Sequence, residues 1–176
     1  MPKKIVLIGG PATGKTTIIN ALKARGYQCM EEISRQIIIE AQKNGIDQLF
    51  LEEPIWFSKQ LLENRKKQYT EAENSDESIV FFDRGIPDIV AYLDYIDIDY
   101  GQEFVSVCKT HKYDKIFILP PWKDIYSTDN ERYESFDELL KIQKYLKKWY
   151  KKFDYDMIEV KKAPVKDRLE FILNSI

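Results

Sequence analysis

A glycine-rich segment near the start of the chain constrains the fold more than any other feature. Gly9–Thr16 reads GGPATGKT and fits the pattern G-x-x-x-x-G-K-[ST]. It follows Ile5–Ile8, an apolar run typical of a central strand buried on both faces, and it leads into Lys15–Ala24, a predicted helix that Gly26 ends. A loop in this context turns its N–H groups inward and binds phosphate at the helix N-terminus. The alternative is an ordinary glycine turn with an exposed lysine.

In a loop of this type the lysine reaches the β- and γ-phosphates of a nucleoside triphosphate, and the hydroxyl that follows it holds Mg²⁺. These residues are Lys15 and Thr16. Asp83 ends the apolar run Ile79–Phe82, in the form of the second nucleotide motif, where a carboxylate sits beside the magnesium. Thr16 and Asp83 are therefore the predicted metal ligands. The residues expected to bind the nucleotide are Gly9, Pro11, Ala12, Thr13, Gly14, Lys15, Thr16 and Thr17.

An arginine comes directly after this aspartate. Arg84 and Gly85 follow the strand, so Arg84 is expected at the carboxyl edge of the sheet, where open α/β proteins bind their ligands. A structural salt bridge is the other interpretation of Arg84.

Strand-like and helix-like segments alternate along the rest of the chain. This alternation indicates a parallel sheet with helices on both faces, as in α/β proteins. The expected strands are Ile5–Ile8, Tyr27–Met30, Ser78–Asp83, Lys115–Leu119 and Met157–Val160. The expected helices cover 15–24, 33–44, a segment from 54 to beyond 69, a segment from 87, 102–111, a segment from 135 and a segment from 164.

Residues 121–134 are polar and aromatic without periodicity, so we expect a long mobile loop there. Ser135–Glu138 then forms a capping box at the start of a helix. The lysines between Lys141 and Lys152 fall mostly opposite the apolar stripe of that helix and predict a solvated face, with a site for anionic lipid or nucleic acid as the alternative. Because no linker or repeat interrupts the sequence, residues 1–176 are expected to form a single domain.

Three pieces of the sequence together resemble the P-loop kinase group. They are the GGPATGKTT loop, Glu32-Ile33-Ser34-Arg35 and Phe82-Asp83-Arg84-Gly85. More narrowly, the chain is similar to the AAA-type ATPase family that includes the nicotinamide riboside kinase domain of NadR. The Trp122-to-Arg132 and Pro164-to-Arg168 segments also resemble that family, so the similarity spans nearly the whole chain. The loop is specific for nucleotide binding in general, and the shorter pieces also occur in thymidylate and deoxynucleoside kinases.

The resemblance implies a P-loop NTPase three-layer sandwich, with a five-stranded parallel sheet of order 2-3-1-4-5 and with ATP and Mg²⁺ at its carboxyl edge. It implies that Glu32 and Asp83 handle the acceptor and the metal, and Glu31 is a rival to Glu32. Arg35 and Arg84 would be charges on the acceptor side, where they would bind the substrate together with Glu32.

The resemblance also makes the 121–134 loop a lid, in which Arg132 supplies positive charge to the transferring phosphoryl group. The chain departs from the usual pattern here. Arg132 is the only arginine between Arg84 and Arg168, so a typical pair of lid arginines is not evident. Lys123 could supply a positive charge in place of a second arginine, but it could not donate the two parallel hydrogen bonds that a guanidinium group forms.

Composition excludes several classes of function. The 27 basic and 29 acidic side chains give a net charge of −2, which argues against nucleic-acid binding through bulk positive charge. Cys29 and Cys108 indicate free thiols in a reducing cytosol, so a cytoplasmic protein is expected. With a single histidine and no metal-ligand spacing, a zinc site is not expected. The longest apolar runs are four or five residues, too short for a membrane span.

Aromatic residues add two candidates near the acceptor. Trp56 and Phe57 begin the helix after Pro54, where they either stack on an acceptor ring or pack in the core. Tyr92 is expected to be a packing or surface residue rather than a ligand contact.

Two functions fit these residues. The first is transfer of the γ-phosphoryl group of Mg·ATP to the hydroxyl of a small nucleoside-like or ribosyl acceptor, with Lys15, Asp83, Arg132 and Glu32 as catalytic residues. The second is an NTPase whose hydrolysis drives a conformational or partner-binding cycle without an acceptor. A third function, that of a nucleotide sensor without enzymatic activity, is supported less well. ATP is favoured over GTP because Pro120–Asp124 lacks the N-K-x-D form of GTPases. The acceptor, the oligomeric state and the choice of base among Glu31, Glu32 and Asp83 stay open.

Overall fold

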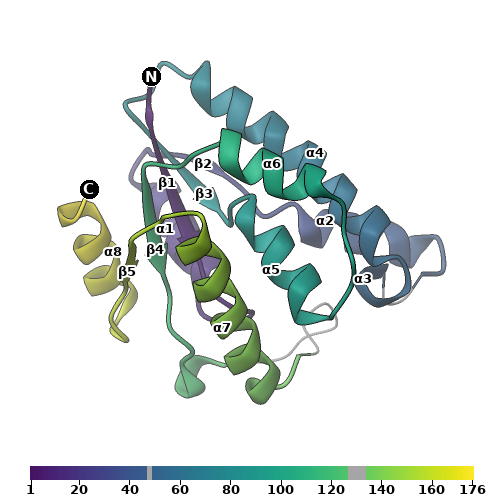
Figure 1. Cartoon of the computed structure of the whole chain (residues 1–176). Coiled ribbons are helices and arrows are strands. Elements are labelled where there is room, and N and C mark those ends of the chain that lie inside the picture. Colours follow the sequence, from purple (N-terminus) through teal and green to yellow (C-terminus); the bar gives the residue numbers. More distant parts are fainter. Residues whose placement is uncertain (47–48, 127–133) are drawn as a thin grey trace.

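Five parallel strands form one sheet with the order β2-β3-β1-β4-β5 in the computed structural model (Figure 1). The structure describes residues 1–46, 49–126 and 134–176. The order and the flanking helices confirm the predicted fold, and each expected strand is present to within two residues at either end. The strands are β1 (Lys3–Ile8), β2 (Gln28–Met30), β3 (Ile79–Asp83), β4 (Lys115–Ile118) and β5 (Met157–Glu159).

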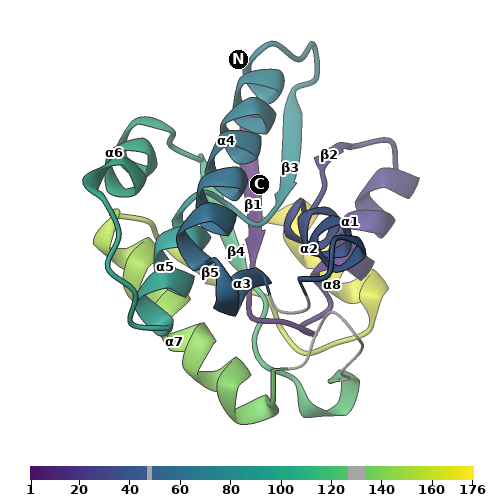
Figure 2. The ribbon, with the colours of Figure 1, turned by 90° about the vertical axis from the view of Figure 1, so that its right-hand side faces the viewer.

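Successive residues of β1 point to opposite faces of the sheet, as strand geometry requires. Ile5 and Leu7 lie in a core with α1 (Lys15–Ala24) and α8 (Val165–Asn174), and Figure 2 shows these two helices together on one side. Both residues are fully buried, which explains why β1 is a continuous apolar run rather than an alternating one.

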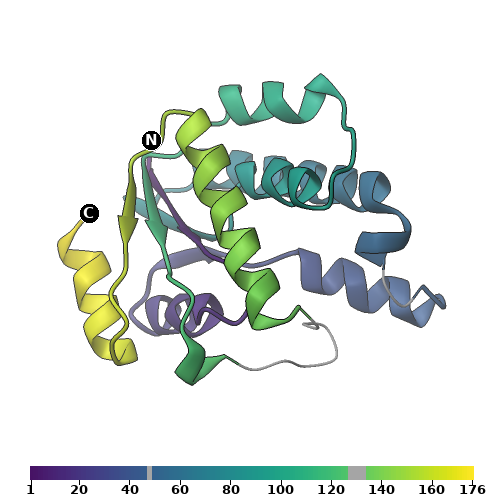
Figure 3. The same ribbon diagram turned by 60° about the horizontal axis from the view of Figure 1, so that its bottom comes forward.

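The opposite face of the sheet carries the larger core. Val6 and Ile8 of β1 lie in it, and they are as fully buried as their neighbours on the other face. Most of the helical residues of this core come from α4 (Pro54–Glu73), α5 (Pro87–Tyr95), α6 (Gln102–Thr110) and α7 (Phe136–Lys152), and two further helices add Ala41 and Leu49. Helix α7 crosses the sheet with its N-terminal end at the edge where β1 ends, which is visible in Figure 3.

The capping box predicted at the start of α7 is confirmed. The Ser135 hydroxyl accepts a hydrogen bond from the Glu138 backbone N–H at 3.3 Å, and the Glu138 carboxylate accepts one from the Ser135 N–H at 2.7 Å. The lysines of α7 are all exposed, which agrees with a solvated face.

Two short elements, α3 and η1, were not expected. Helix α3 (Leu49–Glu52) is a single turn that packs against α2 (Ser34–Lys43), and it is too short to show any periodicity in the sequence. The loop predicted over 121–134 contains a 3₁₀ turn, η1 (Lys123–Ile125), closed by a hydrogen bond from the Tyr126 N–H to the Lys123 carbonyl at 3.3 Å. Residues 127–133 of that loop lie outside the described residues. Within the described part of the chain, no helix combines the length and the apolar character needed to cross a membrane.

Candidate functional site

The Gly9–Thr16 loop joins β1 to α1 at the carboxyl edge of the sheet. Gly14 has φ of +86°, in the left-handed region that favours glycine, and a Cβ there would lie 2.8 Å from Nη1 of Arg168. The turn leads directly into α1, whose first backbone N–H groups have no acceptor within the helix. The sequence therefore places a helix N-terminus, the kind of structure that can bind an anion, where the motif predicted one.

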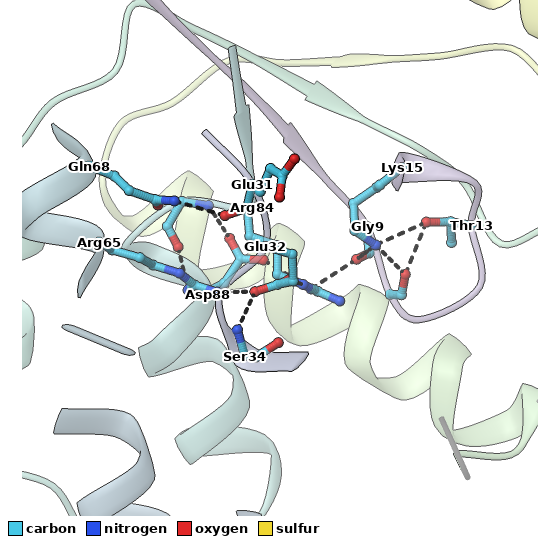
Figure 4. Close-up of polar contacts among 12 residues, drawn as sticks. Gly9, Thr13, Lys15, Glu31, Glu32, Ser34, Arg65, Gln68, Arg84 and Asp88 are labelled. Atoms are coloured by element: carbon cyan, nitrogen blue, oxygen red, sulfur yellow. Dashed lines mark hydrogen bonds and ion pairs between the residues drawn. The ribbon is translucent and has the colours of Figure 1, made fainter. Parts of the chain in front are cut away.

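Lys15 folds back over this loop, as Figure 4 shows. Its Nζ donates to the Gly9 carbonyl at 2.8 Å and to the Gly10 carbonyl at 2.7 Å, and the residue is only 6% exposed. Burial, and then the positive charge of Arg84, lower the pKa of Lys15 to about 7. Phosphate oxygens would offer this ammonium group negative charge in place of neutral carbonyl oxygens.

Asp83 ends β3 beside Leu7 of β1 and is 5% exposed. Burial, and then the negative charge of Glu32, raise the pKa of Asp83 to about 6. Its Oδ1 is buried and has no hydrogen-bond partner among the residues that the structure describes. An orphaned carboxylate oxygen next to a phosphate-binding loop fits a hard cation such as Mg²⁺.

Thr16 lines the same cavity as Asp83, so a hydroxyl and a carboxylate could both face a cation there. In residues 1–46, 49–126 and 134–176, no group of three or more His, Cys, Asp or Glu side chains could hold a metal ion. Mg²⁺ needs no such cage, because it usually binds through one or two carboxylates together with phosphate oxygens. Asp83 and Thr16 therefore fit a nucleotide-bound Mg²⁺.

Glu32 follows β2 and is held between two arginines. Its Oε1 accepts hydrogen bonds from the Ser34 N–H at 3.1 Å and from Nη2 of Arg65 at 3.3 Å, and its Oε2 forms an ion pair with Nε of Arg84 (Figure 4). Burial works to raise the pKa of Glu32, but Arg84 and Arg65 outweigh it and lower the pKa to about 2. Glu32 is thus a fixed, ionised acceptor of hydrogen bonds.

Arg84 connects this carboxylate to the phosphate-binding loop. Its Nη1 donates to the Gly9 carbonyl and to Oδ1 of Asp88, both at 3.2 Å. Its backbone φ is +73°, an uncommon conformation for a residue with a Cβ that the surrounding contacts must maintain. Arg84 therefore lies between the loop and Glu32, in contact with both.

One cavity of about 420 Å³ contains all these groups. The phosphate-binding loop, Asp83, Glu32 and Arg84 form the polar part of its lining. Another part of the lining is an apolar wall of aliphatic and aromatic side chains. The wall consists of Ile38, Ile39, Phe50, Phe57, Leu61, Ile89 and Tyr92.

The protein family described as AAA domain matches residues 4–168, which include the loop and every polar group of the cavity named above. The chain belongs to this family. The predicted membership is thereby confirmed. A comparison with curated proteins gave no match.

Solved structures show which fold this AAA-domain chain has. A deoxyadenosine kinase from M. mycoides with dCMP and dCDP bound is 19% identical, with a TM-score of 0.72 over 98% of this chain and 97% of that chain. The thymidylate kinase from Candida albicans is 14% identical, with a TM-score of 0.73 over 99% of this chain and 91% of the kinase. At these identities the similarity establishes a shared fold.

NadR in complex with NR is a third similar structure, 18% identical with a TM-score of 0.73. The match covers 99% of this chain and 50% of the NadR chain, so the AAA-domain chain spans half the length of that protein.

The structure of this AAA domain brings most of the predicted site residues together. Of the eight residues expected to bind nucleotide, all except Gly9 line the cavity, and Gly9 contributes its carbonyl to Lys15 and Arg84. Arg35 also lines the cavity. Arg132, the predicted lid arginine, lies outside the described residues.

The two rival glutamates differ in their surroundings. The Glu31 carboxylate pairs with Lys23, and its side chain is 60% exposed, whereas the Glu32 side chain is 19% exposed and held by two arginines. Arg84 forms the ion pairs that its structural interpretation expects, with Glu32 and Asp88, and all three residues line the cavity, so its role toward a ligand stays a prediction.

Sequence reasoning missed several residues that shape the site. Arg65 lies in the middle of α4, and nothing in its local sequence points to Glu32. Asp88 was detectable as the i+4 partner of Arg84 at the start of a helix. Tyr92 lines the cavity although it was expected to be a packing or surface residue, and its position beneath Arg84, 5.5 Å from ring centroid to Cζ, depends on tertiary packing.

Proposed function

We propose that this protein transfers the γ-phosphoryl group of Mg·ATP to the hydroxyl of a small nucleoside-like or ribosyl acceptor. The observation that carries the proposal is one cavity that is lined both by a phosphate-binding loop and by the apolar wall, with ionised Glu32 among its polar groups. The similar solved structures include nucleoside and nucleotide kinases, which supports the same assignment.

The loop and Lys15 would bind the triphosphate. The loop amides and the N-terminus of α1 face its oxygens, and Lys15 moves from the Gly9 and Gly10 carbonyls to the β- and γ-phosphates. Thr16 and Asp83 would hold Mg²⁺, which neutralises charge on the β- and γ-phosphate oxygens when it is bound.

Glu32 would position and deprotonate the acceptor. The acceptor oxygen forms a bond to the γ-phosphorus as the bond to the β–γ bridging oxygen breaks, and the hydroxyl proton passes to Glu32. A carboxylate with a pKa of about 2 is a weak base. It suffices in a loose transition state, because the hydroxyl becomes acidic only as its oxygen bonds to phosphorus.

The remaining residues would complete the site. Arg84 and Arg35 would face the acceptor, with Arg84 also keeping Glu32 ionised. The 121–134 segment would act as the lid, and Arg132 would stabilise charge on the transferring group. Residues 1–176 would work as one P-loop kinase-like domain.

The test is a panel of nucleosides and related ribosides incubated with Mg·ATP, with ADP release and phosphorylated product both measured. We expect at least one acceptor to raise ADP release well above basal hydrolysis. If none does, the protein is an NTPase without a small-molecule acceptor.

Two variants make the assignment sharper. Glu32→Gln should abolish transfer, whereas Glu31→Gln should keep most of it, because the Glu31 carboxylate pairs with Lys23 near the surface. If Glu31→Gln abolished transfer and Glu32→Gln kept most of it, Glu31 would be the base.

A further inference from the structure

Helix α7 buries two polar side chains within an otherwise apolar stripe. Gln143 and Tyr150 are 5% and 0% exposed, and their separation of about two helical turns puts them on the same side of the helix. Burying an amide or a phenol costs free energy unless its hydrogen bonds are made. Apolar side chains would satisfy packing alone, so the partners of these two groups indicate what the helix does.

Gln143 orients one peptide group of the phosphate-binding loop. Its Oε1 accepts a hydrogen bond from the Gly10 N–H at 3.1 Å. That N–H belongs to the same planar peptide group as the Gly9 carbonyl, so fixing one fixes the direction of the other. The Gly9 carbonyl accepts hydrogen bonds from Lys15 at 2.8 Å and from Arg84 at 3.2 Å. A single glutamine therefore sets the peptide that contacts both cations.

The loop also has little room to move toward α7. A Cβ on Gly10 would overlap the side chain of Leu139, which lies one turn before Gln143. The second hydrogen bond of Gln143, from Nε2 to the Leu119 carbonyl at 3.1 Å, ties the same side chain to the end of β4. Gln143 thus holds the loop against both the helix and the sheet.

Tyr150 is connected to Arg84 through Asp88. Its hydroxyl donates to Oδ2 of Asp88 at 2.6 Å, and the same oxygen accepts from the Gly85 N–H at 3.1 Å. Oδ1 of Asp88 accepts from Nη1 of Arg84 at 3.2 Å, and Arg84 in turn pairs with Glu32. The chain of contacts from Tyr150 therefore ends at the predicted base.

We infer that Gln143 and Tyr150 are positioning residues, through which α7 fixes the phosphate-binding loop and the Arg84–Glu32 pair relative to each other. One rigid helix then sets the distance between the donor and acceptor halves of the cavity. This inference rests on the proposed phosphotransferase function. It predicts that the two residues affect different constants. Gln143 contacts the loop directly and should affect the dissociation constant for ATP, whereas Tyr150 acts through Asp88 and should affect kcat/KM for the acceptor.

The experiment compares two substitutions that keep side-chain shape and remove hydrogen bonds. Gln143→Met should raise the dissociation constant for ATP about tenfold, measured by calorimetry. Tyr150→Phe should leave that constant within about twofold and lower kcat/KM for the acceptor about tenfold. The control is Tyr155→Phe, which loses the hydrogen bond from the Tyr113 N–H at 3.1 Å but keeps the ring that packs against Tyr150; neither Tyr113 nor Tyr155 lines the cavity. It should lose stability without changing either constant.

All constants are measured well below the unfolding temperature of each variant, so that a loss of stability alone does not change them. The inference is wrong if Tyr150→Phe matches Tyr155→Phe in kinetics, or if Gln143→Met binds ATP like the wild type. Should Gln143→Met not fold, the comparison of the two tyrosine variants decides.

If the wild type transfers phosphate to no acceptor, the proposed function fails but the inference is still tested. ATP affinity then reports on Gln143, and the rate of ATP hydrolysis reports on Tyr150. Wild-type values for both variants would overturn the positioning role.

Discussion

Two carboxylates that line the same cavity, one buried and one half-buried, have pKa values shifted in opposite directions. The pKa of Glu32 is about 2 and that of Asp83 is about 6, although burial works to raise both. The difference comes from their partners, because two arginines contact Glu32 whereas Oδ1 of Asp83 lacks a partner in the described residues. Glu32 is therefore charged at every physiological pH, and ionised Asp83 is stabilised once a cation binds.

The lowered pKa of Glu32 makes stability depend on pH. A carboxyl whose pKa falls on folding contributes stability that is present above its ordinary pKa of 4.5 and is lost as the pH falls toward about 2. We expect Glu32→Gln to be less stable than the wild type at neutral pH, since Arg65 and Arg84 lose their anionic partner. The difference should shrink below about pH 4.5.

Urea unfolding of both proteins at neutral pH and at about pH 3.5 measures this difference. A gap between the two free energies of unfolding that stays constant over this range would contradict the ion pairing of Glu32.

The lowered pKa of Lys15 predicts proton uptake when nucleotide binds. With a pKa of about 7, Lys15 is mostly neutral at about pH 8 in the empty site, and anionic phosphates would raise its pKa again. Binding of ATP at about pH 8 should therefore take up nearly one proton, while Asp83, already ionised, contributes little.

Calorimetry in two buffers of different ionisation enthalpy measures the number of protons. Lys15→Met should remove the uptake and weaken binding. Uptake that persists in this variant would assign the titration to another group.

At the level of elements, the strands were predictable because the central ones are buried on both faces and read as apolar runs. Helix α7 was predictable from its capping box and its apolar stripe. The apolar stripe did not predict a role for Gln143, since a pattern of apolar residues carries no information about a polar residue between them. The single turn α3 and the 3₁₀ turn η1 are too short for any periodicity to show.

The capping box gives a prediction for α7 alone. Ser135→Ala removes the acceptor for the Glu138 N–H, so we expect a loss of about 1 kcal/mol in the free energy of unfolding. Ser106→Ala, at an exposed position inside α6, is the matched control and should change stability by less than about 0.5 kcal/mol. Equal effects in urea unfolding would show that the cap contributes nothing specific.

Across the whole molecule, the sequence predicted the polar half of the cavity better than the apolar half. The loop and Asp83 lie in local motifs, where a short segment has to satisfy phosphate geometry by itself. The apolar wall combines side chains from α2, α3, α4 and α5, among them Phe50 and Tyr92. Such a wall exists only after packing, and no single segment encodes it.

The apolar wall therefore gives a prediction about the acceptor alone. Phe57 is 4% exposed and lines the cavity, whereas its neighbour Trp56 is 51% exposed on the outside of α4. Phe57→Leu keeps an apolar side chain but removes the ring, so it should raise KM for the acceptor about tenfold and leave ATP affinity unchanged. Trp56→Leu removes a larger ring and should change neither constant. If Phe57→Leu weakens ATP binding as much as acceptor use, the cavity does not divide into donor and acceptor halves as proposed.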